Sequence, residues 1–578
     1  FSLFLSQESI SFNYESKYGN GKHVKDANLM PGQDSEETAY SYFENLLDIN
    51  FSYKNLFLYT QLEYSNSPIY GIERIDIKNL ANTYNAEYTN SHLMIKYGHI
   101  QSMYAYGLTV NMFQDQNIDF DNRVKGWEIN YSPHENLDIF FISGNGTFGT
   151  KTKPDLRLNN LLFDHTLVLS GAQFYTNFGD ILLSSSKKRI NYLFNGDWTS
   201  LDFENIYSPD TRLGNDFEDF WIKMLQEGNS AFLDSVCTVD NYVSSKSFNI
   251  AFSKSFNFFD FYIENEINEY NKILRTNYED GYRRYLSIST DILGLSILYE
   301  AKDYNMLYYM PITSNPPLLL NEQTSVLMSR NRHNVNFSDE LGHQIEGRFS
   351  INKTDFLINL SMGMSHSGIK DSDGEEYKKV SFLNDVIFMD FLNNDLKAHN
   401  PFRDFYLEAS GWKNNNSFFY KIGYNLFSSY SGTYSPDKDF KSYTIPAQFV
   451  LVFKNNNSIS LYYDFQKSKT LNKIYNTENP EILINKKYTN SYASLSYHIN
   501  DFGTLTYFRD SENMKILIND SESDKIWEGW EMNFELSSSM QFSIFQGSQK
   551  GGLVCANGIC AEQPSFKDGT KMTFRVLF

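Results

Sequence analysis

The chain has 578 residues, of which 16% are aromatic, and it carries a formal net charge of −20 at pH 7. This length exceeds the roughly 250–300 residues at which a single soluble core stops growing, yet no linker or change of composition divides the chain. The aromatic content excludes disordered, coiled-coil and collagen-like chains. The excess of acidic over basic residues excludes nucleic acid as a partner, because nucleic-acid binding needs a basic surface.

Alternation of apolar and polar residues recurs from one end of the chain to the other and indicates β-strands with one apolar face. Residues 47–53 form a clear strand, and Lys54-Asn55 turn the chain into a second strand at residues 56–62. No run reaches the roughly 18 apolar residues that a membrane-spanning helix needs. The chain is therefore built from hairpins and not from helices.

The same pattern is clearest in the last third of the chain. In residues 459–466 one face is apolar, and it consists of Ile459, Leu461, Tyr463 and Phe465. Residues 530–536 repeat the pattern and turn at residues 537–539 into residues 540–544. The opposite, polar faces of these two stretches include Asp464, Gln466, Glu531, Asn533 and Glu535.

Short and long connections alternate along the chain. We predict short turns near residues 54, 90, 135, 178, 256, 293, 353, 414, 456, 500 and 538. Longer polar segments lie between these turns, and the longest are residues 188–241, 304–342 and 368–400. Short turns at one end of the strands and long loops at the other are typical of outer-membrane β-barrels.

We therefore predict an all-β fold, a transmembrane antiparallel β-barrel of about 24 strands (22–26) in which residues 1–578 form one domain. Closure into a barrel satisfies every backbone hydrogen bond within a bilayer. We expect the short turns on the periplasmic side and the long loops outside the cell. The loops 188–241, 304–342 and 368–400 are candidates to cap or plug the lumen, and the first is long enough to hold another strand pair. A β-propeller or β-helix would need a fixed repeat, which the irregular spacing lacks.

Residues 104–127 interrupt two predicted strands with a mixture of aromatic and acidic residues. They form either an ordinary long surface loop or a segment folded into the lumen. In the second case we expect a polar constriction formed by Asp115, Asp119, Asp121 and Arg123.

Several patterns resemble catalytic or binding sites without meeting their structural requirements. Gly144 to Gly149 have the spacing of a dinucleotide-binding loop, but no helical pattern follows them. Residues 363–368 place serine and histidine between glycines without the spacing of a hydrolase nucleophile. Acidic residues at 371–376 and 520–524 are the oxygen ligands that calcium prefers, but a solvated acidic loop explains them better. We expect no catalytic residue, cofactor or metal site, and hence no enzyme.

Three cysteines are too few for a disulfide scaffold. Cys555 and Cys560 enclose an Asn-Gly pair that favours a tight turn, so we expect a disulfide between them and an oxidising compartment. A metal site is the alternative, although no histidine or second cysteine pair lies nearby. The third cysteine, Cys237, then has no cysteine with which to pair in the chain.

The last nine residues form an amphipathic strand that ends in an aromatic residue. This pattern is similar to the C-terminal signal that the outer-membrane assembly machinery recognises. The residues expected to form the signal share one face of the strand and are Met572, Phe574, Val576 and Phe578.

Two stretches resemble a known family. They are the segment around Tyr106-Gly107 with residues 121–126, and the tail from Gly547 to Cys560 that precedes the final strand. Both are similar to an uncharacterised family of large outer-membrane β-barrel proteins of Bacteroidota-type bacteria, defined as a domain of unknown function. The resemblance implies a barrel fold and an outer-membrane location over essentially the whole chain. It implies no activity and no catalytic residues.

Two functions of different classes fit these observations. The first is a channel or transporter for polar solutes, whose acidic lumen would favour cations or neutral compounds. The alternative is a barrel subunit or scaffold of a multiprotein outer-membrane secretion or assembly complex, with a closed lumen. A strand pattern at Ile10, Phe12 and Tyr14 disfavours the separate plug domain of TonB-dependent transporters. A third function, that of an outer-membrane hydrolase, would need catalytic residues from distant strands to come together.

The expected location is the outer membrane of a Gram-negative bacterium. Expected partners are outer-membrane lipid, the outer-membrane assembly machinery during biogenesis, and other outer-membrane or periplasmic proteins.

Overall fold

A computed structural model describes most of the chain. The described residues are 8–25, 36–66, 83–115, 120–148, 163–192, 242–270, 281–306, 316–317, 319, 325–330, 339–366, 399–431, 438–474, 482–500, 502–516, 521–556, 559–563 and 565–578. Within 552–563 only the backbone is described. Residues 193–241 and 367–398 therefore lie outside the described residues, and so do the loops and the extra strand pair expected there.

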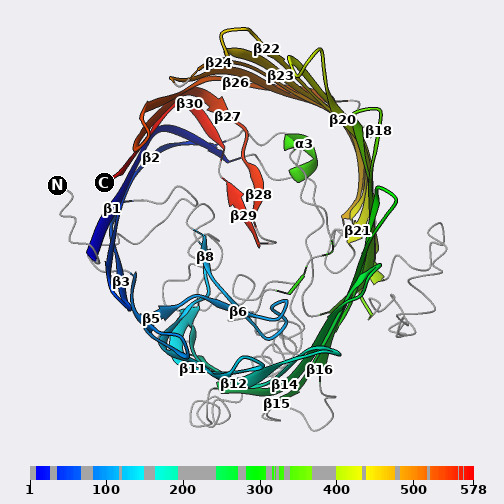
Figure 1. The fold of residues 1–578 in the computed structure, drawn as a ribbon. Helices are drawn as coiled ribbons and strands as arrows, with labels where there is room; N and C mark the ends of the chain where they lie inside the picture. Colours follow the sequence, from blue (N-terminus) through cyan, green and yellow to red (C-terminus); the bar gives the residue numbers. More distant parts are fainter. Residues whose placement is uncertain are drawn as a thin grey trace, which may run out of the picture.

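Twenty-four antiparallel strands form one sheet that closes on itself, because the first strand pairs with the last (Figure 1). This confirms the predicted barrel and its strand number. The barrel strands are β1 (Glu8–Lys25), β2 (Glu36–Tyr53), β3 (Leu56–Asn66), β4 (Thr83–Thr89), β5 (Leu93–Ile100), β10 (Val124–His134), β11 (Leu137–Phe148), β12 (Phe163–Thr176), β13 (Gly179–Tyr192), β14 (Tyr242–Ser255), β15 (Asp260–Tyr270), β16 (Gly281–Ile292), β17 (Leu295–Asn305), β18 (Asp339–Ile351), β19 (Thr354–Met364), β20 (Phe402–Lys413), β21 (Phe418–Ser431), β22 (Lys438–Val452), β23 (Ser458–Ile474), β24 (Ile482–Ile499), β25 (Gly503–Ile516), β26 (Ser521–Ser537), β27 (Met540–Gln549) and β30 (Phe566–Leu577).

Each predicted short turn joins two consecutive barrel strands, from β2–β3 at residues 54–55 to β26–β27 at residues 538–539. All of these turns lie at one end of the barrel, because successive strands run antiparallel. We call this end the short-turn end and the opposite one the long-loop end. Both chain termini lie at the short-turn end, as an even number of strands requires.

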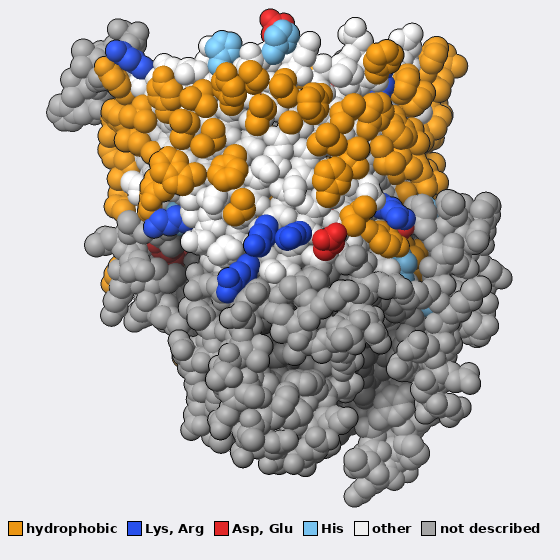
Figure 2. Space-filling view, turned by 90° about the horizontal axis from the view of Figure 1, so that it is seen from below, with side chains coloured by type: hydrophobic (Ala, Val, Ile, Leu, Met, Phe, Trp, Pro, Cys, Tyr) orange, Lys and Arg blue, Asp and Glu red, His pale blue; other side chains and the backbone are white. Residues whose placement is uncertain are grey.

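The outer and inner faces of the wall follow the alternation of the sequence. In β15, Ile263 and Ile267 are 43% and 48% exposed on the outside, whereas Glu264 and Glu266 on the inside are both 0% exposed. On the face of the wall that Figure 2 shows, the outward side chains form a hydrophobic belt (Figure 2). An apolar belt flanked by polar margins is the pattern of a barrel that stands in a bilayer.

The inner face carries several apolar clusters among its polar residues, and the cluster with the most buried residues lies on β11–β14. Buried inward residues of β11–β14 form a core with residues from the chain between β5 and β10, and this core consists of Ile100, Val110, Met112, Val124, Phe140, Ile142, Leu167, Leu169, Leu182 and Ala251. The described residues among 101–123 cover this part of the wall, and we call them the lumen insert. It contains four short strands, β6 (Ser102–Tyr104), β7 (Val110–Met112), β8 (Gln114–Asp115) and β9 (Phe120–Asp121).

Two further pieces lie within the ring of strands in Figure 1. One is a single helical turn, α3 (Val326–Ser329), from the predicted loop 304–342. The other is a hairpin of β28 (Gly552–Ala556) and β29 (Ile559–Gln563). In the described parts of the chain, no helix combines the length and hydropathy needed to cross a membrane.

The final strand closes the barrel. β30 pairs with β27 on one side and with β1 on the other. Met572 and Phe578 are exposed on its outward face, whereas Val576, whose partners in the neighbouring strands are Tyr14 and Met540, is buried. The role of this strand in assembly stays a prediction.

Candidate functional site

The tip of the lumen insert is a tight turn between β6 and β7. Gly107 donates its backbone N–H to the carbonyl oxygen of Tyr104 at 3.2 Å. Ala105 and Gly107 have φ angles of 54° and 82°, in the left-handed region that glycine tolerates best. This turn directs residues Tyr106 to Thr109 toward the inner faces of β13–β16.

Two buried cations hold the backbone of the tip. Arg283 of β16 donates from Nη1 to the carbonyl oxygen of Leu108 at 2.6 Å. Lys188 of β13 donates from Nζ to the carbonyl oxygen of Thr109 at 2.7 Å. Arg283 also lies 3.5 Å from the carboxylate of Glu266. Buried charges are costly unless they are paired and hydrogen-bonded, and the insert supplies part of that pairing.

A buried carboxylate holds the other side of the tip. Glu264 of β15 accepts hydrogen bonds from the backbone N–H of Tyr106 at 3.0 Å, from the Tyr262 hydroxyl at 2.7 Å and from the Asn249 amide at 2.9 Å. The wall therefore offers cations to the carbonyl groups of the tip and a carboxylate to its N–H group. This complementarity fixes the tip in one place.

The tip also contacts the second insertion. Leu108 packs in an apolar cluster with Tyr285, Tyr304 and Leu319, and Leu319 belongs to the predicted loop 304–342. The hydroxyl of Tyr304 donates to the carbonyl oxygen of Pro317 at 3.0 Å. Two segments far apart in the sequence thus meet on the inner wall.

The helical turn α3 docks on the wall formed by β23–β25. The Asp464 carboxylate accepts hydrogen bonds from the Ser325 hydroxyl at 2.8 Å and the Leu327 N–H at 3.2 Å. Gln466 donates to the Leu327 carbonyl oxygen at 3.2 Å, and Arg330 pairs with Asp510 at 2.6 Å. Asp464 and Gln466 face inward, as the alternation predicts. The described parts of the loop 304–342 lie inside the barrel, while its proposed role as a cap or plug stays a prediction.

The structure places three of the four predicted constriction residues, Asp115, Asp121 and Arg123, at the base of the insert. Arg123 pairs with Asp121 at 2.9 Å and donates to the Thr83 hydroxyl at 3.0 Å. Asp115 lies in β8, opposite Phe120, and Asp119 lies outside the described residues. Arg123 and Asp121 are therefore brought together, and they anchor the insert to the wall near β4.

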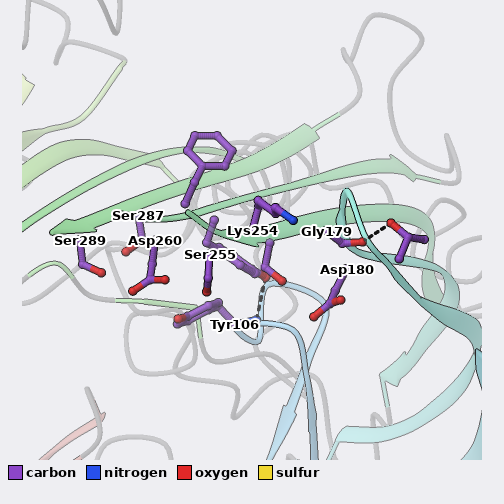
Figure 3. Close-up of a pocket in the computed structure, with 12 residues that line it drawn as sticks. Tyr106, Gly179, Asp180, Lys254, Ser255, Asp260, Ser287 and Ser289 are labelled. Atoms are coloured by element: carbon purple, nitrogen blue, oxygen red, sulfur yellow. Dashed lines mark hydrogen bonds between the residues drawn. The ribbon is translucent and has the colours of Figure 1, made fainter. Parts of the chain in front are cut away.

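A polar cavity of about 500 Å³ lies on the inner wall, beside the tip and toward the short-turn end (Figure 3). Its residues come from β12–β16 and the lumen insert and are Tyr106, Thr176, Gly179, Asp180, Ser253, Lys254, Ser255, Asp260, Phe261, Tyr262, Ser287 and Ser289. Lys254 donates to the Asn177 carbonyl oxygen at 2.6 Å. We call this cavity the tip pocket.

Tyr106 forms one side of the tip pocket and contacts the rings of Tyr262 and Tyr285, with ring centroids 4.2 and 5.3 Å away. Burial raises the pKa of the Tyr106 hydroxyl, and the nearby carboxylates of Glu300, Asp260 and Glu264 raise it further. This hydroxyl is therefore neutral at physiological pH. The pocket offers hydroxyl groups, two carboxylates and an aromatic ring, and it can bind small polar compounds.

A second buried polar group lies at the long-loop end. His366, within the histidine-containing motif at residues 363–368, is hydrogen-bonded through Nε2 to Asp303 at 2.8 Å and through Nδ1 to Asp339 at 2.9 Å. Burial alone would lower the pKa of His366, but the hydrogen bonds to Asp303 and Asp339 outweigh it and raise the pKa above its ordinary value. The histidine bridges β17 and β18.

The remaining motifs have structural positions. Gly144 and Gly146 lie within β11. Cys555 and Cys560 are paired positions of the β28–β29 hairpin, but their side chains lie outside the described ones, so the disulfide stays a prediction. Among the described side chains, no group of three or more His, Cys, Asp and Glu residues is placed to hold a metal ion.

A profile described as "Family of unknown function (DUF6029)" matches residues 5–578. The chain belongs to this family. No curated protein matches the chain. The match covers the whole barrel and the lumen insert, so both are parts of the DUF6029 domain.

Solved structures similar to this DUF6029 protein include a mutant of the ferric enterobactin receptor PfeA from Pseudomonas aeruginosa, with 8% identity, a TM-score of 0.42, and coverage of 98% of this chain and 80% of that one. The outer membrane transporter YddB from Escherichia coli has 8% identity, a TM-score of 0.39, and coverage of 98% and 81%. The outer membrane protein OpdK from Pseudomonas aeruginosa has 9% identity, a TM-score of 0.36, and coverage of 80% and 100%. These values are too low to support an argument about function.

Sequence reasoning missed the wall residues that hold the tip, such as Lys188, Glu264 and Arg283. The sequence does contain a signal for the part of the wall that the lumen insert covers. Residues 139–142 and 167–169 are apolar at every position, so both faces of these strands must be shielded from water. The charged wall residues carried no comparable signal, because polar inward residues are expected in any water-filled barrel.

Proposed function

We propose that this protein is an outer-membrane channel or transporter for small polar solutes, that it is not an enzyme, and that the lumen insert narrows its path. The tip pocket is the observation that carries the proposal. A closed barrel of this size leaves a wide aqueous lumen unless something fills it, and here the insert directs solutes past a polar cavity at the short-turn end.

The lining of the tip pocket supports cations and neutral polar compounds as solutes. Asp180 and Asp260 contribute two carboxylates, whereas Lys254 lies on the outward face of β14 and its amine donates to the Asn177 carbonyl oxygen. Rings of carboxylates favour cations in pores. Ser253, Ser255, Ser287 and Ser289 add hydroxyl groups that can replace hydrogen bonds to water.

Single-channel conductance of the purified protein in a planar bilayer tests the proposal. We expect a steady, cation-preferring current, and we expect the double variant Asp180→Asn with Asp260→Asn to lose most of that preference. The variant Ser287→Ala is the matched control, because it alters the same pocket without changing its charge. A protein that inserts into the bilayer but passes no current would contradict the proposal.

The alternative is a scaffold with a closed lumen, and one observation favours it. The lumen insert and the loop 304–342 are both held by buried polar contacts and meet at Leu108 and Leu319. Such docking is compatible with a permanent closure. The absence of any current in the bilayer, together with stable co-purification of outer-membrane or periplasmic proteins, would favour this function over transport.

A further inference from the structure

Two carboxylates line the tip pocket, one on each side of β14. Asp180 belongs to β13 and Asp260 to β15, and within the described part of the chain neither side chain forms a hydrogen bond or an ion pair. The carboxylate of Glu264, beside the tip, already accepts three hydrogen bonds. The amine of Lys254 lies on the outward face and donates to the Asn177 carbonyl oxygen. The two aspartates therefore present uncompensated negative charges to the pocket.

The strand pairing fixes the spacing of these carboxylates. Asp180 lies directly opposite Ser253 of β14, and Asp260 lies directly opposite Ser255 of the same strand. The two acids are separated by two strand spacings of about 4.8 Å and by two residues of about 3.4 Å each along β14, which places their Cα atoms about 12 Å apart. Figure 3 shows the two side chains on either side of Ser255.

This spacing excludes a single metal ion as the shared partner of the two acids. Calcium and magnesium bind oxygen ligands at about 2.0–2.6 Å, so one ion cannot reach two inward-facing carboxylates about 12 Å apart. A monovalent cation neutralises only one of them. A solute that neutralises both must carry two positive charges several ångströms apart.

The distance between the acids matches a short aliphatic diamine. A hydrogen bond of about 2.8 Å from an ammonium group to each carboxylate leaves roughly 6 Å between the two nitrogens, which is about the length of an extended chain of four carbons. Serine hydroxyls at positions 253, 255 and 289 adjoin the two acids and can accept the remaining N–H groups. The rings of Tyr106 and Tyr262 line the same cavity, and aromatic faces attract ammonium groups.

We propose that the tip pocket binds aliphatic diamines, with one ammonium group on Asp180 and the other on Asp260. This inference rests on the proposed function, because it names the class of cation that the path through the lumen selects. A solute with two ammonium groups gains a second ion pair over a solute with one. It loses that gain when its chain is too short to span the two acids.

Equilibrium binding to the purified full-length protein in detergent tests the proposal. Isothermal titration calorimetry compares 1,4-diaminobutane with 1-aminobutane, which has the same carbon chain and one charge, and with 1,2-diaminoethane, which has two charges on a shorter chain. We expect 1,4-diaminobutane to bind about fivefold more tightly than either, since an exposed ion pair contributes up to about that factor. Asp180→Asn and Asp260→Asn should each bind 1,4-diaminobutane no more tightly than 1-aminobutane.

The matched control is Glu535→Gln, which removes an exposed carboxylate from the inner face of β26, across the lumen from β14. It should keep the preference for 1,4-diaminobutane, and heat-modifiable migration in gels checks that all variants remain folded. Equal affinity for the diamine and the monoamine, equal affinity for the two diamines, or an equal loss in the control would each overturn the proposal.

The outcomes also separate this inference from the proposed function. A cation-preferring current in a planar bilayer without any preference for 1,4-diaminobutane in calorimetry would overturn the diamine site alone. Binding of 1,4-diaminobutane that depends on Asp180 and Asp260, in a protein that passes no current, would support the site and contradict the transport function.

Discussion

The guanidinium group of Arg283 donates a hydrogen bond of 2.6 Å to the backbone carbonyl oxygen of Leu108, a residue 175 positions earlier in the chain. Both residues are buried. Arg283 belongs to the barrel wall and Leu108 to the tip of the lumen insert, so this contact joins the fixed and the inserted parts of the protein. The position of the insert therefore depends on a small number of charged wall residues.

Replacing Arg283 with alanine is expected to release the tip. A hydrogen bond to a charged group contributes about 1.5–3 kcal/mol, so its loss shifts the docked population by about 10- to 100-fold. The barrel should still assemble, because the strand pairing of β16 is made by its backbone. We expect larger or more frequent single-channel openings in a planar bilayer, together with faster uptake of small polar solutes into liposomes.

The control for this experiment is Arg509→Ala, which removes an arginine whose side chain is 54% exposed and pairs with Glu528. It should conduct like the wild type. If Arg283→Ala also conducts like the wild type, the insert does not limit the path, and the role proposed for the tip is wrong.

The outer face of the barrel could be predicted from the sequence, while much of the lumen could not. Outward residues such as Leu461 and Trp530 alternate with inward ones because lipid and water impose opposite requirements on the two faces of each strand. The same requirement makes each strand recognisable between its turns, and the strands can therefore be counted. This information is local, and a single sequence contains it.

The contents of the lumen depend on contacts between distant residues. Nothing near Glu264 in the sequence indicates that its carboxylate accepts a hydrogen bond from the backbone N–H of Tyr106, 158 residues away. The alternation predicts that Asp464 of β23 faces inward. It does not predict that the hydrogen-bond partner of Asp464 is Ser325, which belongs to the loop 304–342. Such pairs are set by the three-dimensional path of the insertions, which periodicity does not encode.

His366 should make the stability of the barrel depend on pH. Its pKa in the folded protein is raised above the ordinary value near 6.5, because the protonated ring is held by Asp303 and Asp339, while Arg284 lies 3.5 Å from Asp303. A raised pKa stabilises the folded state fully below about pH 6.5, and this contribution disappears as the pH rises through the folded-state value.

We expect the unfolding temperature, followed by heat-modifiable migration in gels, to fall between pH 5.5 and 8.5 in the wild type. The variant His366→Gln should unfold at a lower temperature at pH 5.5 and show a smaller change between the two pH values. His134→Gln, which alters an exposed histidine at a short turn, should retain the wild-type profile. Identical pH profiles for His366→Gln and the wild type would refute the bridging role.

The β28–β29 hairpin allows a test of the predicted disulfide. Cys555 and Cys560 are directly opposite in its ladder, and opposite residues of antiparallel strands have Cα atoms about 4.5–5.5 Å apart, within the range that a disulfide spans. We expect the native protein to show a mass about 2 Da below that of the reduced form, and the variant Cys555→Ser to assemble normally. Free thiols at both positions in native protein would contradict the prediction.

The last prediction concerns the closure of the barrel. Phe578 donates its N–H to the carbonyl oxygen of Phe12 at 2.8 Å and accepts a hydrogen bond from the Phe12 N–H at 3.1 Å. Its ring is 70% exposed on the outside. Deleting Phe578 removes both backbone bonds and the ring, whereas Phe578→Ala removes the ring and keeps the bonds.

We expect both variants to reach the outer membrane at less than about half of the wild-type amount, measured by quantitative immunoblotting of membrane fractions, because the aromatic terminus is predicted to act as an assembly signal. Phe502→Ala is the control, since it removes an exposed aromatic ring from a short turn elsewhere on the same end of the barrel. If the deletion alone reduces the amount, the two backbone bonds to Phe12 matter and the ring does not. Wild-type amounts of both variants would mean that neither the closing bonds nor the signal limits assembly.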